Sequence, residues 1–192
     1  MLIRHGEFGC GAMQTPADRQ MDSNNHKTAG AWRPAAVNDL IDIQRIGDQI
    51  HPDLHERPEV FAERLKLFSE GCFVLVQNEQ VVGYGLSHPW FLNSIPPLDQ
   101  LLGSIPQSPG CLLIHDVAAL PQARGHGAAA ILIELTAKLA RKHGIPCLAL
   151  VSVYNTRPLW ARLGFEVISD SSLTDKLKSY GQTARYMIRK SD

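Results

Sequence analysis

The sequence has no excess of charge of either sign, because 19 lysines and arginines balance 19 aspartates and glutamates. Nucleic-acid binders and polybasic membrane-surface proteins are rich in basic residues, so this balance argues against both classes. No apolar run approaches the roughly 18 residues that span a bilayer, and residues 1–30 lack the apolar stretch of a secretory signal. We therefore expect neither a nucleic-acid partner nor a membrane partner.

Cysteine is scarce and gives no sign of a metal site. The four cysteines are widely spaced and form no C-x-x-C pair, which argues against structural zinc; they are Cys10, Cys72, Cys111 and Cys147. The last three lie in apolar, strand-like segments and are interpreted as small buried hydrophobic residues. Reduced thiols of this kind suit a cytoplasmic location, with no metal ligands expected.

Size and composition predict one globular domain. The chain has 192 residues, of which 44% are apolar and 20% charged, enough to bury a sizeable core. Residues 1–30 are polar and show no hydrophobic period, so we interpret them as a disordered leader before a single domain over residues 31–192.

Hydrophobic patterns predict alternating strands and helices. Apolar and β-branched runs favour strands at residues 31–34, 72–76, 81–86, 111–120, 147–153, 165–168 and 186–188. Helical spacing and proline or glycine boundaries favour helices at residues 37–50, 58–70, 128–143 and 158–163. The strands around the 128–143 helix should be parallel neighbours and the hairpin before them antiparallel, which gives a mixed sheet with helices on both faces. Residues 91–110 hold four prolines and no clear period, typical of a functional or mobile loop.

The turn between the 111–120 strand and the 128–143 helix is rich in small residues. Residues 120–129 read Leu-Pro-Gln-Ala-Arg-Gly-His-Gly-Ala-Ala. A helix N-terminus carries unpaired N–H groups and a partial positive charge, and small residues there let a phosphate approach the backbone. The alternative is that glycine and alanine simply allow tight packing. The spacing fits neither the P-loop nor the G-x-G-x-x-G pattern. The small residues at the helix N-terminus nevertheless favour a site for a phosphorylated cofactor.

Two motifs resemble the GNAT superfamily of N-acetyltransferases. Arg124, Gly127 and Ala129 fit the acyl-CoA signature Gln/Arg-x-x-Gly-x-Gly/Ala. Residues 155–165 resemble a later segment in which an aromatic residue, here Trp160, stands four positions before a closing Gly-Phe. The resemblance covers residues 111–167. It implies an α/β (α+β) GNAT-like fold: a mixed, mostly antiparallel sheet flanked by helices, with a central βαβ unit that binds acyl-CoA. It also implies an acetyl-CoA-dependent N-acetyltransferase acting on a primary amine of a small molecule or peptide.

The resemblance places acetyl-CoA, as co-substrate, on two stretches of backbone. The pyrophosphate would lie on N–H groups at the helix start, and the pantetheine arm would pair with the exposed edge of the preceding strand. The implied contact residues are Val117, Ala118, Ala119, Arg124, Gly125, His126, Gly127, Ala128, Ala129, Ala130, Asn155 and Trp160. A side chain at Gly125 or Gly127 would crowd the phosphates or demand an unfavourable φ. The alternatives are plain strand core for residues 117–119 and helix capping for Asn155 with Thr156.

Transfer to an amine needs a base for the amine and an acid for the leaving thiolate. Many family members use a tyrosine as the acid where this chain has Trp160, and an indole N–H is no useful acid. Trp160 then shapes the acyl pocket or packs in the core, and Tyr154 is the substitute candidate. For the base, His115 and Asp116 precede the signature on one strand, and burial beside the cofactor would raise the pKa of the carboxyl. Because neighbouring strand residues face opposite sides, we expect at most one of the two in a given cleft.

The acceptor amine is not identified by any motif. Polar and aromatic residues flank the acceptor side of this fold and favour a polar or cationic acceptor; they are His51, His55, Glu56, His88 and Trp90. His51 and His55 have the spacing of a metal pair, but no third ligand completes it, so we interpret them as a loop feature. Acceptor choice should lie in residues 51–58 and 91–110.

Two rival functions stay open at this point. One is a non-catalytic acyl-CoA-binding module of the same fold, and the other is a nucleotide-phosphate binder with an unrelated strand–helix turn. Homodimers are common in the GNAT superfamily, although no residue here indicates one.

Overall fold

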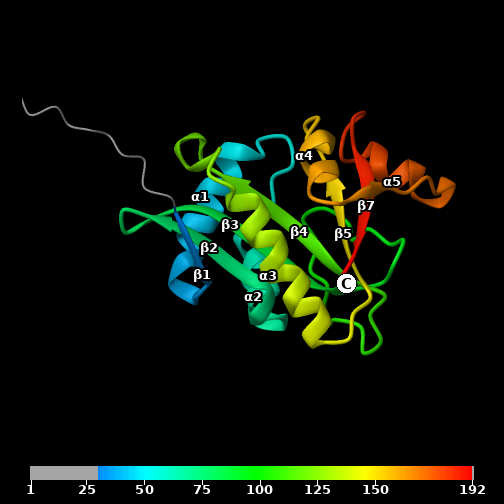
Figure 1. Ribbon diagram of the computed structural model, residues 1–192, viewed down its shortest axis with the longest axis horizontal. Coiled ribbons are helices and arrows are strands. Elements are labelled where there is room, and N and C mark those ends of the chain that lie inside the picture. The colour runs from blue at the N-terminus through cyan, green and yellow to red at the C-terminus, as the bar shows by residue number, and fades with distance from the viewer. Residues whose placement is uncertain (1–29, 192) are drawn as a thin grey trace, which may run out of the picture.

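The structure, a computed structural model, describes residues 30–191, so the predicted leader lies outside the described residues except for Gly30. Seven strands form one sheet in the order β1-β2-β3-β4-β5-β7-β6 (Figure 1). Their bounds are β1 Ala31–Pro34, β2 Cys72–Gln77, β3 Gln80–Trp90, β4 Cys111–Ala119, β5 Cys147–Ser152, β6 Glu166–Val167 and β7 Arg185–Lys190. Only β4 and β5 pair in parallel, and the other neighbours are antiparallel. The predicted mixed, mostly antiparallel sheet is confirmed.

Helices cover both faces of the sheet. The α-helices are α1 Leu40–Ile50, α2 Pro58–Leu67, α3 Ala128–Lys142, α4 Arg157–Arg162 and α5 Thr174–Lys178. Short 3-10 turns are η1 Val37–Asp39, η2 Ser69–Gly71, η3 Pro121–Ala123 and η4 Ser171–Leu173. In Figure 1, α1 and α2 lie behind the sheet and α3 lies in front of it.

Strand β4 divides its residues between these two layers. Leu112 and Ile114 pack with α3, whereas Leu113 packs with the 91–110 loop and with residues 171–180, here named the α5 segment. Further along the strand, Ala118 belongs to the core beneath α1 and α2. Both faces of β4 are therefore buried, as a central strand with apolar residues at successive positions requires.

Most element boundaries follow the sequence pattern, with two differences. Strand β3 continues to Trp90, because Ser87 to Trp90 pair with β4 although Pro89 and a histidine interrupt the apolar run. The sequence analysis assigned no element to residues 169–184, where the structure has η4 and α5. These short turns have too few residues for a helical period to be visible, and the contact of Leu173 with the sheet stabilises them.

The cysteine prediction is confirmed for the three residues that the structure describes. Cys72, Cys111 and Cys147 are free and buried, while Cys10 lies outside the described residues. Across residues 30–191, no helix is both long enough and apolar enough to cross a membrane.

Candidate active site between the separating strands

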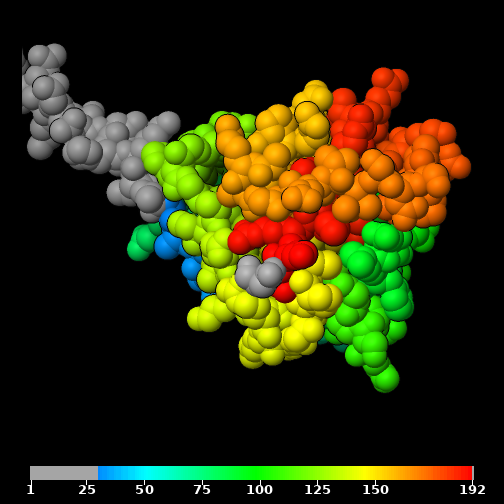
Figure 2. Space-filling view, turned by 45° about the vertical axis from the view of Figure 1, so that its right-hand side comes forward, coloured from blue at the N-terminus to red at the C-terminus, as the bar shows by residue number. Residues whose placement is uncertain are grey.

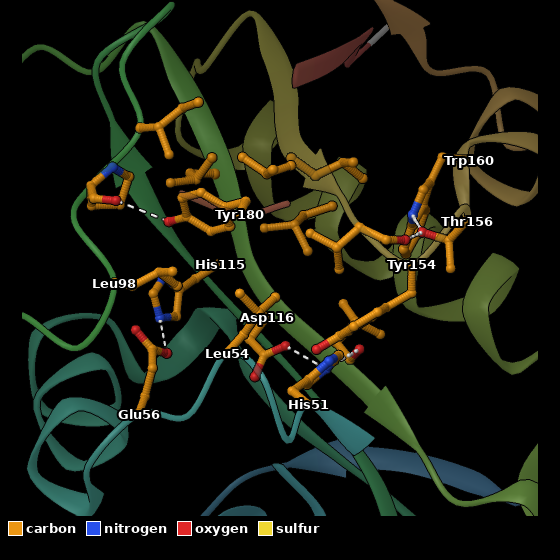
Figure 3. Close-up of a pocket in the computed structure, with 18 residues that line it drawn as sticks. His51, Leu54, Glu56, Leu98, His115, Asp116, Tyr154, Thr156, Trp160 and Tyr180 are labelled. Carbon is orange, nitrogen blue, oxygen red and sulfur yellow. Dashed lines mark hydrogen bonds and ion pairs between the residues drawn. The ribbon is translucent and has the colours of Figure 1, made fainter. Parts of the chain in front are cut away.

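The two parallel strands pair only along part of their length. The parallel register joins residues 112–114 of β4 to residues 148–150 of β5, although β4 runs on to Ala119 and β5 to Ser152. Figure 1 shows the two strands side by side at one end and apart at the other. A pocket lies in this opening, lined by both strands, by the segment after α1, by the 91–110 loop and by α4 (Figure 3). The edge of β4 that faces β5 is therefore unpaired over residues 115–119, and it borders the opening.

Of the three strand residues expected to contact the cofactor, the structure brings only the first into the pocket. Val117 lines it, whereas Ala118 is buried in the core beneath α1 and α2. The carbonyl of Ala119 accepts a hydrogen bond of 3.0 Å from Nε of Arg124. A ligand that pairs with a strand edge uses backbone groups, so a buried Ala118 side chain is compatible with this role.

The small-residue turn presents a bare helix N-terminus. Gly125 and Gly127 have φ of +88° and +73°, and a Cβ at either would meet nothing within 4 Å. The protein itself therefore needs glycine here for the left-handed backbone rather than for space. Gly127 is the N-cap of α3 and makes no side-chain capping hydrogen bond. Within residues 30–191, the backbone N–H groups of residues 125–130 donate to no carbonyl, so they are free to meet an anion.

A β-bulge in β4 corrects the expectation that His115 and Asp116 face opposite sides. Asp116 pairs with Leu86 and Ile114 pairs with the next β3 residue, Ser87, which leaves His115 as the extra residue. A bulge places two residues opposite one and shifts the alternation that follows. Both His115 and Asp116 consequently line the same pocket.

Asp116 is held by two donors from other elements. His51 Nε2, just after α1, lies 3.0 Å from Oδ1, and the Tyr84 hydroxyl of β3 donates to Oδ2 over 2.5 Å. Burial alone would raise the pKa of Asp116, but the charge of His51 and the hydrogen bonds from His51 and Tyr84 outweigh it and lower the pKa. The expected rise in the pKa of this carboxyl is therefore wrong, since the sequence does not reveal these partners.

His51 is tuned in the opposite direction. Burial would lower the pKa of His51, but the charge of Asp116 and the hydrogen bond to it prevail and raise the pKa. Nε2 also lies 3.3 Å from the Val117 carbonyl. Because both neighbours are acceptors, they stabilise the charged ring, which donates from Nε2. His51 is therefore part of the site and not the loop feature that the sequence suggested.

A second acid–imidazole pair lines the pocket. Glu56 Oε2 lies 2.8 Å from His115 Nε2, and both side chains are 5% exposed. Glu56 Oε1 accepts the backbone N–H of Asp99 in the 91–110 loop. His88 packs against the His115 ring, and burial, followed by the neighbouring His115 charge, lowers the pKa of His88 to about 3. His88 is therefore neutral at physiological pH.

The third catalytic candidate, Tyr154, also reaches the pocket. It lies after β5 in a left-handed conformation, φ +50°, and its ring stacks on His51 with centroids 5.7 Å apart. Burial, with the charge of Asp53 next, raises the pKa of the phenol, so the hydroxyl keeps its proton. Figure 3 shows Tyr154, His51 and Asp116 close together, with Glu56 and His115 to one side and Trp160 to the other.

Trp160 lines the pocket and belongs to the core. It is 8% exposed, packs edge-on against Phe165, and donates from Nε1 to the Thr156 hydroxyl over 3.0 Å. That hydroxyl in turn donates to the Val153 carbonyl. The expected capping role is wrong: Thr156 is the N-cap of α4 but its side chain makes no capping bond, and Asn155 is exposed with φ +59°.

Sequence reasoning missed the residues that complete the site. Tyr84 gave no signal, and the roles of His51 and Glu56 are set by partners far along the chain. The Tyr84–Asp116 and Glu56–His115 contacts span 32 and 59 residues. The one signal for His51 and Glu56 was that polar residues between α1 and α2 flank the acceptor side.

Comparison with known proteins identifies the family of this chain and shows which solved structures share its fold. A family model described as "Acetyltransferase (GNAT) family" matches residues 37–165. No curated protein sequence matches the chain significantly.

Solved structures are similar in fold at low sequence identity. Ard1 from Thermoplasma volcanium has a TM-score of 0.63 at 16% identity, with 85% of this chain and 98% of that one covered. The GNAT-like decarboxylase GphF, solved with isobutyryl-CoA, has a TM-score of 0.69 at 16% identity, covering 84% and 100%. Arabidopsis thaliana Naa50, solved with the bisubstrate analogue CoA-Ac-MVNAL, has a TM-score of 0.61 at 13% identity, covering 84% and 97%.

Proposed function

The chain belongs to the acetyltransferase (GNAT) family, and we propose on this premise that it transfers the acetyl group of acetyl-CoA to a primary amine. The observation that carries the proposal is the separation of β4 from β5 with titratable side chains in the opening. Asp116, His115, Glu56 and His51 all line that pocket. A thioester placed there would lie beside groups able to accept a proton from an attacking amine.

The residues present fit acetyl-CoA, which would supply the acyl group as a thioester. Backbone N–H groups of residues 125–130 would hold the pyrophosphate at the positive end of α3. Arg124 is exposed beside them. The edge of residues 115–119 would pair with the pantetheine arm, and Trp160 would form the wall near its end.

We assign proton acceptance from the amine to the Asp116–His51 pair. Asp116 is 18% exposed on its side chain and has a lowered pKa, so it is ionised and attracts an ammonium group. The Asp116 carboxylate would accept the amine proton and pass it to Nε2 of a neutral His51, whose raised pKa lies closer to physiological pH, where a base works best. His115 is committed to Glu56, so we place it outside the proton-accepting pair.

Tyr154 is our candidate for the acid that protonates the leaving thiolate. Its hydroxyl stays protonated because its pKa is raised. Its ring stacks on His51, so it lies at the Asp116 end of the pocket. Trp160 supports the pocket by packing, since its N–H is already donated to Thr156.

Two glycines at opposite ends of α3 provide a matched test of the cofactor site. Gly127 and Gly144 both have positive φ, and a Cβ at either meets nothing within 4 Å. Gly127→Glu should abolish CoA binding in calorimetry because it puts bulk and negative charge at the phosphate position. Gly144→Glu carries the same backbone strain and charge and should keep wild-type affinity.

The reaction itself is tested by incubating the protein with acetyl-CoA and a panel of amines and measuring the CoA thiol that is released. Transfer to at least one amine is the expected result. Tight CoA binding with no transfer to any amine would instead favour the acyl-CoA-binding module. Unchanged CoA affinity in a folded Gly127→Glu protein would mean that the cofactor site is misplaced.

A further inference from the structure

The acceptor side of the pocket is apolar apart from its two acid–imidazole pairs. Six residues form this wall, from the 91–110 loop, β4, β5 and the end of the α5 segment. They are Ile95, Pro96, Leu98, Leu113, Val151 and Tyr180. The polar residues expected to define the acceptor contribute less than the sequence suggested, because His55, His88 and Trp90 are not among the lining residues. An acceptor therefore meets two carboxylates, those of Asp116 and Glu56, with hydrocarbon around them.

The described part of the chain places no lysine or arginine on the wall of this pocket. Arg64 is fully buried and does not line the pocket, and its guanidinium is engaged by Glu63 at 2.6 Å and by the Gln100 carbonyl at 3.0 Å. The imidazoles of His51 and His115 each face a carboxylate. A negatively charged group on the acceptor would thus find two carboxylates and no unpaired cation.

The wall is fixed in place by contacts that join residues 91–110 to residues 51–58 and to Tyr180. Asp99 accepts from the Arg57 N–H at 2.7 Å, and its own N–H donates to Glu56. The Tyr180 hydroxyl donates to the Pro96 carbonyl over 3.0 Å. Figure 2 shows the loop packed beside the α5 segment. A wall held by these hydrogen bonds is preformed, so it should select acceptors that match it and should not rearrange around each one.

We infer that the acceptor is a primary amine with an apolar group close to the nitrogen and no neighbouring carboxylate, so that free amino acids are rejected. This inference rests on the proposed transfer to an amine. The ammonium group would lie between the Asp116 and Glu56 carboxylates, and the apolar group would lie against Leu98, Leu113 and the ring of Tyr180. Both a hydrophobic alkylamine and the N-terminus of a peptide with an apolar first residue have this chemistry.

A pair of acceptors that differ only in the carboxylate tests the inference. 3-Methylbutylamine is leucine without its carboxylate, and it is the more basic amine, so a larger neutral fraction cannot favour it. We expect kcat/KM for 3-methylbutylamine to exceed that for leucine at least about tenfold, because like charges brought together are strongly unfavourable. Leucinamide should exceed glycinamide about tenfold or more, because it fills the apolar wall. A Leu-Gly-Gly peptide amide distinguishes a polypeptide source from a small-molecule source.

A charge added to the wall should reverse the preference. Leu98→Arg places a guanidinium on the pocket wall and should raise the ratio of leucine to 3-methylbutylamine at least about tenfold. Leu101→Arg is the matched control, since Leu101 is on the same loop but 56% exposed and does not line the pocket. It should leave the ratio unchanged.

The outcomes separate this inference from the proposed function. Equal use of leucine and 3-methylbutylamine by an active enzyme overturns the inference and leaves the transferase assignment standing. If CoA binds but no amine is acetylated, the transferase assignment fails. The same two amines are then compared for binding to the CoA complex by NMR, where weaker binding of leucine supports the inference and equal binding overturns it.

Discussion

Replacement of Asp116 by asparagine should move the pH dependence of the reaction in a defined direction. Burial is the largest influence on His51 and lowers its pKa, whereas the charge and hydrogen bond of Asp116 raise it above the ordinary value of 6.5. Wild-type turnover should therefore rise with pH through a value above 6.5. Without the carboxylate, burial dominates, and the pKa of His51 should fall below 6.5.

The size of the effect follows from what Asp116 does in the structure. It accepts from His51 and Tyr84, and asparagine offers one acceptor oxygen in place of two. Loss of the group that receives the amine proton should lower turnover about a hundredfold or more. Loss of a hydrogen bond to a buried charged group should destabilise the fold by about 1.5–3 kcal/mol.

The assay is the pH–rate profile combined with an NMR titration of the His51 ring. Tyr84→Phe is the first control, because it removes one donor to Asp116 and leaves the His51 contact in place. Its inflection should stay above 6.5 with a smaller loss of rate. His115→Gln is the second control and should leave the inflection unchanged. An Asp116→Asn enzyme with a wild-type inflection, or a His115→Gln enzyme with a displaced one, would refute the reasoning.

The same pair predicts how stability depends on pH. The pKa of His51 is higher in the folded chain, so its contribution is fully present below about pH 6.5 and is lost as pH rises through the folded value. The pKa of Asp116 is lower in the folded chain, so its contribution is present above about pH 4 and is lost as pH falls through the folded value. The denaturant midpoint should therefore be highest between about pH 4 and pH 6.5 and should decrease at lower and at higher pH. Asp116→Asn should weaken both decreases.

Three further changes test other parts of the site. Trp160→Phe should keep most activity, whereas Trp160→Ala should lose about 3–5 kcal/mol in urea unfolding because the ring is buried; a thousandfold lower turnover in a folded Trp160→Phe enzyme with normal CoA affinity would contradict this. Glu56→Gln removes the charged partner of His115, so it should raise KM for the amine about tenfold and leave the Kd of CoA unchanged, and a change in CoA affinity alone would count against our placement. A chain that begins at Gly30 should keep the melting temperature and CoA affinity of the full chain, because polar residues 1–29 offer little apolar surface to bury; a drop of ten degrees or more would show that the leader packs on the domain.

Local chemistry explains why the strands, the main helices and the glycine-rich turn before α3 could be predicted. The run of residues 147–152 is apolar at nearly every position, as a strand buried on both faces requires, and α3 repeats leucine and isoleucine with helical spacing. Gly125 and Gly127 mark the turn because few other residues adopt positive φ there. These signals arise within a few residues of one another, so they are visible in the sequence.

The geometry of the candidate site depended on contacts that no local pattern contains. His115 and Asp116 share a face only because β4 gains one residue relative to β3, and the shift is defined by pairing across two strands. Tyr84 and Glu56 join them from other elements, over 32 and 59 residues along the chain. His51 joins from just after α1, and its contact with the Val117 carbonyl spans 66 residues. The sequence by itself determined the fold class and the glycine-rich turn before α3, since both follow from residue type and short-range spacing. Only the tertiary structure decided which carboxylates and imidazoles meet and therefore in which direction their pKa values move, because burial and Coulomb interaction depend on distance in space and not on distance along the chain.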